Sequence, residues 1–169
     1  MSIELRHSRA AAGLALALIA TATQAHVTAE PREAPPASTQ VVRFRVGHGC
    51  HETSATTALR IELPPGIATA RGQPKAGWTL STDHAADGSV TAMTWTGRLP
   101  GGQFDEFALL LRTPASAATL YFPVVQTCGP EEEQWTEIPD EGEDGHGLRH
   151  PAPALHITPA GPPETGHHP

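Results

Sequence analysis

The sequence predicts an all-β fold, an antiparallel β-sandwich, and three observations lead to this class. Apolar and polar residues alternate along several short runs, as expected for strands with one buried face. Clusters of Pro, Gly, Asp and Ser separate these runs at short intervals. No segment after the first 25 residues keeps a helical period over a useful length. Six or seven short strands separated by turns are typical of a sandwich.

The first three expected strands cover residues 41–46, 57–64 and 77–82. In 41–46 the apolar residues occupy alternate positions and Arg43 and Arg45 lie between them, which predicts one buried and one exposed face. The run 57–64 alternates in the same way and ends at a Pro-Pro-Gly turn. The third run, "GWTLST", is followed by the turn-rich "DHAADG".

The remaining expected strands begin at residue 89. Residues 89–97 are rich in Thr and β-branched residues, which favour strands. The most apolar runs, 104–113 and 118–128, are predicted to be core strands. Because proline cannot donate to a strand ladder, Pro123 indicates a sheet edge or a bulge. The strand set closes at 133–139, and "ALHIT" (154–158) allows one further short strand.

The chain is predicted to have three parts. Residues 1–25 combine an arginine-bearing start, an apolar run and small residues before position 26, which is the pattern of a cleaved secretory signal. Residues 26–158 form the expected β-sandwich domain, and the Pro- and His-rich residues 159–169 are predicted to be disordered. We therefore expect a periplasmic protein that is cut after Ala25 and has no membrane span in its mature form.

Composition excludes some partners. The chain has 11 Lys and Arg against 18 Asp and Glu, a net charge of −7, and therefore lacks the basic surface of a nucleic-acid-binding protein. It has ten histidines, nine of them after the predicted signal. Histidine is the commonest metal ligand, although most of these side chains are expected to be solvated surface groups.

Two cysteines, Cys50 and Cys128, are present. An even number of cysteines in an exported chain favours a disulfide, and we predict this pair. The alternative is a thiolate metal ligand at Cys50, since "GHGCH" surrounds it with imidazoles.

His26 is the main candidate for a metal ligand. Cleavage after Ala25 would leave its α-amine free, and the amine and the ring Nδ1 would then chelate one ion. An α-amine has a pKa near 7.7 to 8.0, so Cu(II) can displace its proton at neutral pH. Nitrogen donors in a tetragonal plane suit Cu(II).

Further ligands must come from elsewhere in the chain. "GHGCH" offers His48 and His51, and "FDEF" offers Asp105 and Glu106 on opposite faces of a strand. We predict His48 and Glu106 as the metal ligands that join His26. Trp135 is either a core residue or a neighbour of the metal.

Several motifs occur in an order that resembles the YcnI-like family of exported copper-binding domains, in its short form without a membrane anchor. They are Ala-His-Val-Thr from residue 25, "HGC", "PKAGWTL", "FDEFALLL", "LYFPVVQTC", "WTEIP" and "HPAP". The resemblance runs over residues 26 to about 155 and implies an immunoglobulin-like or cupredoxin-like sandwich. It also implies Cu(II) binding through a single-histidine brace at His26, with Trp135 near the metal and a carboxylate completing the site. Where some members have a Pro-Asn-Glu-like segment, this chain has "GHGC", so either His48 or Glu106 is the expected replacement.

The sequence therefore predicts a non-catalytic protein of copper handling, acting in import, storage or delivery. Its expected partners are the copper ion and other periplasmic copper chaperones or a copper transporter. No phosphate-binding loop, nucleophile elbow or paired-carboxylate motif is present in the sequence. Two alternatives remain open: an oxidase like the polysaccharide monooxygenases, with His48 as a second imidazole, and a structural β-domain that binds no metal.

Overall fold

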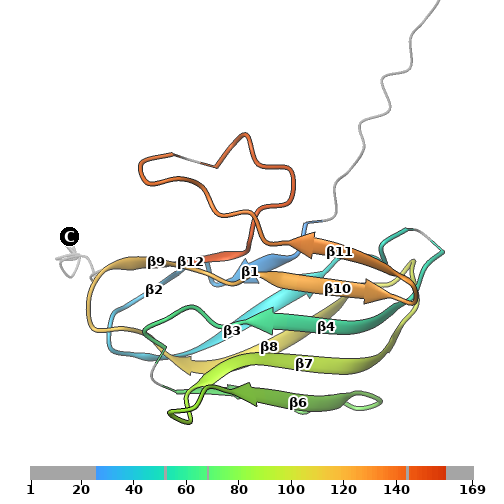
Figure 1. Cartoon of the computed structure of the whole chain (residues 1–169), viewed down its shortest axis with the longest axis horizontal. Coiled ribbons are helices and arrows are strands. Elements are labelled where there is room, and N and C mark those ends of the chain that lie inside the picture. The colour runs from blue at the N-terminus through green and yellow to red at the C-terminus, as the bar shows by residue number, and fades with distance from the viewer. Residues whose placement is uncertain (1–25, 52, 68, 144, 159–169) are drawn as a thin grey trace, which may run out of the picture.

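The computed structural model describes residues 26–51, 53–67, 69–143 and 145–158, and all regular structure in these ranges is β (Figure 1). The strands form two larger sheets that face each other and a small third sheet at one end. The predicted signal, residues 1–25, and the predicted tail, residues 159–169, lie outside the described residues. The predicted all-β sandwich class is confirmed. In the described part of the chain, no helix has the length and apolar character needed to cross a bilayer.

The five-stranded sheet has the order β11-β10-β4-β7-β6, and every neighbouring pair is antiparallel. Its strands are β4 (Thr56–Glu62), β6 (Thr79–His84), β7 (Val90–Leu99), β10 (Val124–Cys128) and β11 (Glu131–Trp135). The four-stranded sheet has the order β1-β3-β8-β5 and is also antiparallel. Its strands are β1 (Thr28–Glu30), β3 (Thr39–Val46), β5 (Ala70–Gly72) and β8 (Asp105–Arg112).

The third sheet joins β2 (Glu33–Ala34), β12 (Ala154–Ile157) and β9 (Ala118–Tyr121) in the order β2-β12-β9. The β2–β12 pair is parallel, which brings the beginning of the domain beside its end. The sheet thereby ties the segment after β1 to the last described strand.

The core lies between the sheets, and the alternating residues of the strands fill it. The largest fully buried side chains are Trp95, Phe44, Phe107, Phe122, Leu59, Ile61, Met93, Leu109, Leu111, Leu155, Ile157 and Val42. Edge-to-face aromatic contacts connect them: Phe44 packs on Phe122, and Phe107 lies between Trp78 and Trp95. In β3 the buried positions are Val42, Phe44 and Val46, as the alternation predicts.

The observed strands differ from the predicted ones mainly where the chain changes sheet. The single run predicted at 118–128 is two strands, β9 and β10, separated by Phe122 and Pro123. Pro123 has no N–H to donate, while its carbonyl accepts the N–H of Glu62 at 2.9 Å. The chain therefore leaves the three-stranded sheet at this residue and enters the five-stranded one.

Three short strands, β1, β2 and β5, were not predicted. Each has only two or three residues, which is too few for alternation to be recognised. The strand predicted at 133–139 begins earlier, at Glu131, and ends at Trp135. From there the chain leaves the sheet in a long loop (Figure 1).

Cys50 and Cys128 form a disulfide, so the predicted pairing is confirmed and Cys50 is not a thiolate ligand. The bond joins the loop after β3 of the four-stranded sheet to the end of β10 of the five-stranded sheet. It therefore connects the two layers of the sandwich directly beside the "GHGCH" segment.

Gly49 is required where this loop passes close to other backbone. A Cβ at Gly49 would lie 1.6 Å from the carbonyl oxygen of Ser54, and the N–H of Gly49 donates to the carbonyl of Gly101 at 3.0 Å. We expect Gly49→Ala to lower the free energy of unfolding by about 1 to 3 kcal/mol, the usual cost of overpacking. Chemical denaturation checks this, with Gly102→Ala as control, because a Cβ at Gly102 meets nothing within 4 Å. Equal stability of the two variants would contradict the prediction.

Candidate metal centre

His26 lies two residues before β1 and is half-buried. Its imidazole packs on the indole of Trp135, with ring centroids 5.3 Å apart and the planes tilted by 56°. The next residue, Val27, is buried in the core and anchors this end of the chain. The structure thus brings together two residues that the sequence proposed for one site.

Trp135 is the last residue of β11 and pairs with Val124 of β10. Trp135 is 5% exposed, so it is a core residue, and it also contacts the predicted ligand His26. Its Nε1–H is buried without a hydrogen-bond partner in the described structure. Buried tryptophan N–H groups usually find a partner, so this unpaired donor is unusual.

His150 is a residue that the sequence reasoning did not single out. Its ring packs on Trp135 with centroids 5.2 Å apart, so the indole contacts two imidazoles. The buried Nδ1 of His150 has no hydrogen-bond partner among the residues that the structure describes and lies 3.9 Å from Oε2 of Glu133. The only sequence signal was the "HPAP" motif, to which no role was assigned.

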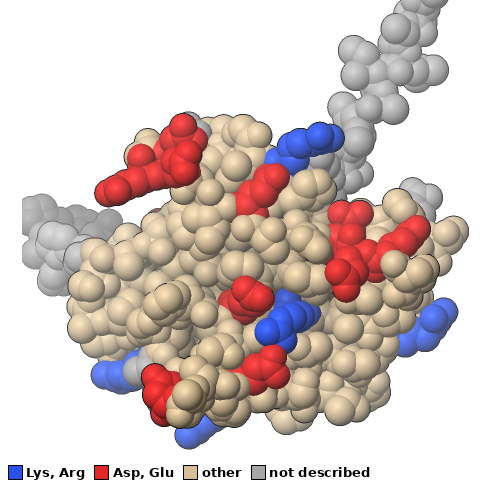
Figure 2. All heavy atoms as spheres, in the orientation of Figure 1, with Lys and Arg blue, Asp and Glu red and all other residues tan. Residues whose placement is uncertain are grey.

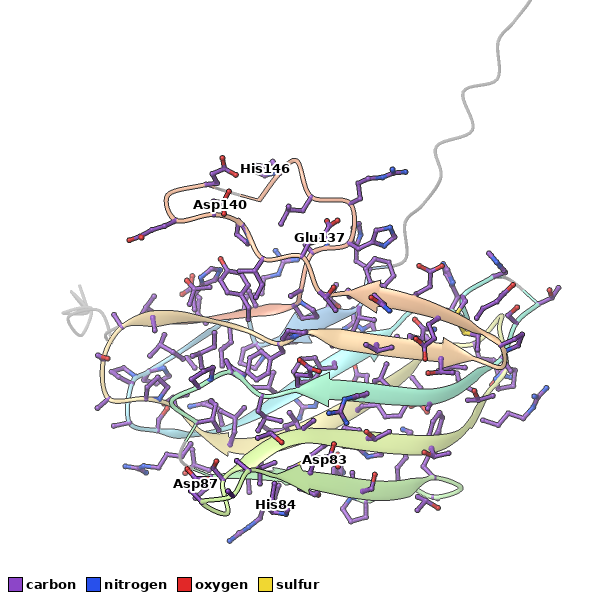
Figure 3. The ribbon with its side chains drawn as sticks, viewed as in Figure 1. Asp83, His84, Asp87, Glu137, Asp140 and His146 are labelled. Atoms are coloured by element: carbon purple, nitrogen blue, oxygen red, sulfur yellow. A yellow bond between two sulfur atoms is a disulfide. The ribbon has the colours of Figure 1, made fainter. Side chains whose placement is uncertain are left out.

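Glu137 closes the loop that carries the chain from Trp135 to His150. Its Oε2 accepts the backbone N–H groups of Arg149 at 2.7 Å and of His150 at 2.8 Å. These charge-assisted bonds hold the pKa of the Glu137 carboxyl below its usual value of 4.5, and the bond from the His150 N–H has the largest effect. Figure 3 places Glu137 at the base of this loop and Asp140 and His146 farther along it.

A shallow pocket of about 250 Å³ opens beside His26. It is lined by residues 26–29 and Arg32 from the beginning of the domain, and by residues 151–154 and His156 from its end. The imidazole of His26 is therefore accessible from one side while Trp135 covers another. This arrangement leaves room for a small ion and for a group that delivers or removes it.

His48 follows β3 at the sheet end that His26 also occupies. β1 and β3 are antiparallel with Thr28 opposite Arg45, so the residues before Thr28 run beside those after Val46. The Nδ1 of His48 contacts the carbonyl oxygen of Gly49, and its backbone carbonyl accepts a hydrogen bond from Nε2 of Gln126 at 2.8 Å. With Nδ1–H donating to a carbonyl, Nε2 keeps its lone pair.

Glu106 lies at the same sheet end, on β8, but its carboxylate has a cationic neighbour. It pairs with Arg45 across the β3–β8 ladder, and the Arg45 guanidinium lies 3.4 Å from the Glu106 carboxylate and 3.1 Å from that of Glu30. The neighbouring Asp105 is bound by Lys75 at 2.6 Å. Both carboxylates thus already have a cationic partner.

His51 is exposed and lies 3.5 Å from Glu131, away from the Trp135 contact. Within the described ranges, no group of three or more His, Cys, Asp or Glu side chains is arranged to hold a metal ion. The described His, Cys, Asp and Glu side chains thus do not gather into such a group around His26.

Comparison with known families gives a match over residues 26–157 to a domain of unknown function, DUF1775. The chain belongs to the DUF1775 family. The match begins at His26 and ends within β12, so it covers the whole sandwich. The predicted membership of the YcnI-like family is confirmed.

A curated relative of this DUF1775 domain is the copper-binding protein CutI of Bacillus subtilis strain 168. It is 29% identical over 96 residues, which are 55% of this chain and 46% of the relative. The chain thus spans about half the length of that protein. A solved structure, an uncharacterised protein from Nocardia farcinica with an immunoglobulin-like fold, is 35% identical with a TM-score of 0.67. It covers 78% of this chain and 97% of its own, so the immunoglobulin-like architecture is confirmed.

Proposed function

We propose that this protein binds Cu(II) in the periplasm through a single-histidine brace made by the α-amine and the Nδ1 of His26 after cleavage behind Ala25. The observation that carries the proposal is the half-buried His26 ring, held against Trp135 and open to a small pocket. The named function of CutI, a copper-binding protein, supports copper as the ion. A backbone amine is also the kind of donor that the side-chain arrangement lacks.

Trp135 suits this role because it supplies a wall and offers no competing donor atom. An indole has only an N–H to offer, so it limits access to the ion without ligating it through a lone pair. Burial of the indole keeps water from that side of His26. The ion would therefore exchange through the pocket on the other side.

Between the two further predicted ligands, the geometry favours His48 over Glu106. The Nε2 of His48 keeps its lone pair, whereas Glu106 is held in an ion pair by Arg45. The resulting set, one amine and two imidazoles, would give Cu(II) the nitrogen plane that it prefers.

We also propose that the protein carries copper without catalysing a reaction. A polysaccharide oxidase needs an exposed aromatic face for the sugar polymer, but here Trp95 and Trp135 are buried, Trp78 is partly buried, and Phe104 is the only exposed Phe or Trp in the described part of the chain. An ion with few protein ligands and an open side can pass to a second protein. A periplasmic copper chaperone or a copper transporter is the partner that this chemistry suits.

A Cu(II) titration tests the proposal. Protein that begins at His26 is compared with protein that carries one extra alanine before His26, both with His167→Ala and His168→Ala to prevent weak binding by these histidines. The extra residue converts the amine to an amide, so we expect the affinity to fall by more than the roughly 10- to 100-fold that loss of an outer-shell partner causes. Equal affinity of the two proteins would rule out the brace.

A further inference from the structure

The loop between Trp135 and His150 rises above the sheets after β11 and returns beside its own start (Figure 1). Its base is closed by a short parallel bridge between Glu137 and Pro151. The N–H of Glu137 donates to the carbonyl of His150 at 3.0 Å, and the carbonyl of Glu137 accepts the N–H of Ala152 at 2.8 Å. The backbone N–H and carbonyl of Glu137 therefore both bind the segment 150–152, where the loop returns.

The side chain of Glu137 doubles this connection. Its carboxylate accepts the N–H groups of both Arg149 and His150, so four hydrogen bonds meet at one residue. An ionised acceptor makes such bonds shorter and stronger than neutral ones. The Glu137 carboxylate thus adds to the backbone hydrogen bonds that place the His150 backbone.

His150 in turn fixes Trp135. The indole packs between the His150 ring, 5.2 Å away, and the His26 ring, 5.3 Å away. Because the Nε1–H of Trp135 has no acceptor among the described residues, no hydrogen bond to them sets the orientation of the indole. Packing alone must set it, and His150 supplies one of the packing surfaces.

We infer that Glu137 and His150 are positioning residues for the copper site: the Glu137 carboxylate places His150, and His150 holds the Trp135 indole against His26. The inference rests on the proposed copper site at His26. Neither residue would touch the ion. Both residues would act on the site through the Trp135 indole that borders it. Replacing either of them would change the shape of the site and the access of the ion.

The alternative is that Glu137 only closes a loop. The two roles predict different effects of a substitution, because a residue that only closes a loop affects stability and leaves the copper site unchanged. The matched control is Glu141→Ala, which removes an exposed carboxylate from the same loop.

The test uses protein that begins at His26 and compares Glu137→Ala, Glu137→Gln and Glu141→Ala. The first readout is the indole N–H resonance of Trp135 without metal, assigned with Trp135→Phe in two-dimensional ¹H–¹⁵N spectra. The second is the Cu(II) electron paramagnetic resonance spectrum, together with the Cu(II) affinity. We expect Glu137→Ala to shift the indole resonance, alter the copper hyperfine splitting and weaken binding by about 10- to 100-fold.

Glu137→Gln should give an intermediate effect, since its amide oxygen still accepts a hydrogen bond but is neutral. Glu141→Ala should match the unsubstituted protein in all readouts. A lower melting temperature for Glu137→Ala with unchanged indole and copper signals would overturn the inference. If Glu137→Ala does not fold, His150→Ala decides in its place: it must shift the indole resonance while the Glu137 bonds to the backbone remain.

The two proposals fail in different ways. If the unsubstituted protein binds no Cu(II), the proposed function is wrong and the inference about the copper site falls with it. If it binds Cu(II) through His26 but Glu137→Ala and His150→Ala leave the indole and copper spectra unchanged, only the positioning roles are wrong.

Discussion

Replacing Cys50 and Cys128 together with alanine is expected to lower the free energy of unfolding by about 4 to 5 kcal/mol. The two cysteines are 78 residues apart, so the bond removes a large amount of chain entropy from the unfolded state. A domain of this size is typically stable by only about 5 to 15 kcal/mol. Removing the disulfide would therefore abolish a large part of the total free energy of unfolding.

Urea denaturation of the double variant beside the intact protein measures the effect. The intact protein treated with a thiol reductant is the control, because it breaks the same bond without changing a residue. Both forms should unfold at a similar, lower urea concentration. A decrease of less than about 1 kcal/mol would show that the packing of the two sheets makes the bond redundant.

The disulfide also matters for the loop that carries His48. The buried Gln126 holds that loop from the five-stranded sheet by donating to the carbonyl of His48 and to Oγ1 of Thr56. These bonds remain after the disulfide is removed, so the loop should loosen without detaching. We therefore expect copper affinity to change less than stability does.

The fold could be predicted from residue alternation because the strands that matter most are long and have one buried face. In β3, alternate buried positions beside Arg43 and Arg45 gave the correct face and nearly the correct bounds. The sheet assignment could not be predicted, because Pro123 either ends a strand or sits at an edge. Which of these occurs depends on the partner strand, and that information is not local.

The sequence predicted the net charge but not how the charged side chains are distributed over the surface. Glu131 to Glu133 lie consecutively in β11, and further acidic residues lie in the loop that follows it. Figure 2 shows acidic groups over the β10–β11 hairpin and over that loop, and further acidic and basic groups elsewhere on the face in view. The elements that carry Trp135 and Glu137 thus also carry several acidic side chains, which create a negative field beside them. Such a field would raise the local concentration of cations.

The candidate site was predicted in part. His26 could be identified because its proposed chelate of amine and imidazole depends only on cleavage of the chain after Ala25. Trp135 was identified from the family resemblance. His150 and Glu137 were missed because their role depends on a long loop that closes on itself. An isolated "HPAP" motif or a lone glutamate carries no sign of that closure.

A panel of single substitutions is expected to separate the ligands of the proposed site. His26→Gln should abolish tight Cu(II) binding, because it removes the ring half of the chelate. His48→Gln should weaken binding by more than the roughly 10- to 100-fold that loss of an outer-shell partner causes, because it removes a direct nitrogen ligand of the proposed site. Glu106→Gln should change it less than about threefold, because Arg45 already occupies that carboxylate.

The matched control is His84→Gln, since His84 is the exposed last residue of β6 and its ring Nδ1 lies 3.1 Å from the carbonyl oxygen of Gly88 (Figure 3). Isothermal titration measures affinity, and nitrogen hyperfine structure in the copper resonance spectrum counts the bound nitrogens. His48→Gln should reduce that count by one and leave the α-amine bound. If Glu106→Gln weakened binding more than His48→Gln, the carboxylate would be the ligand, and Arg45 would have to release it when copper arrives. That outcome would make the Arg45 ion pair a competitor of the metal, and Arg45→Gln would then raise the affinity.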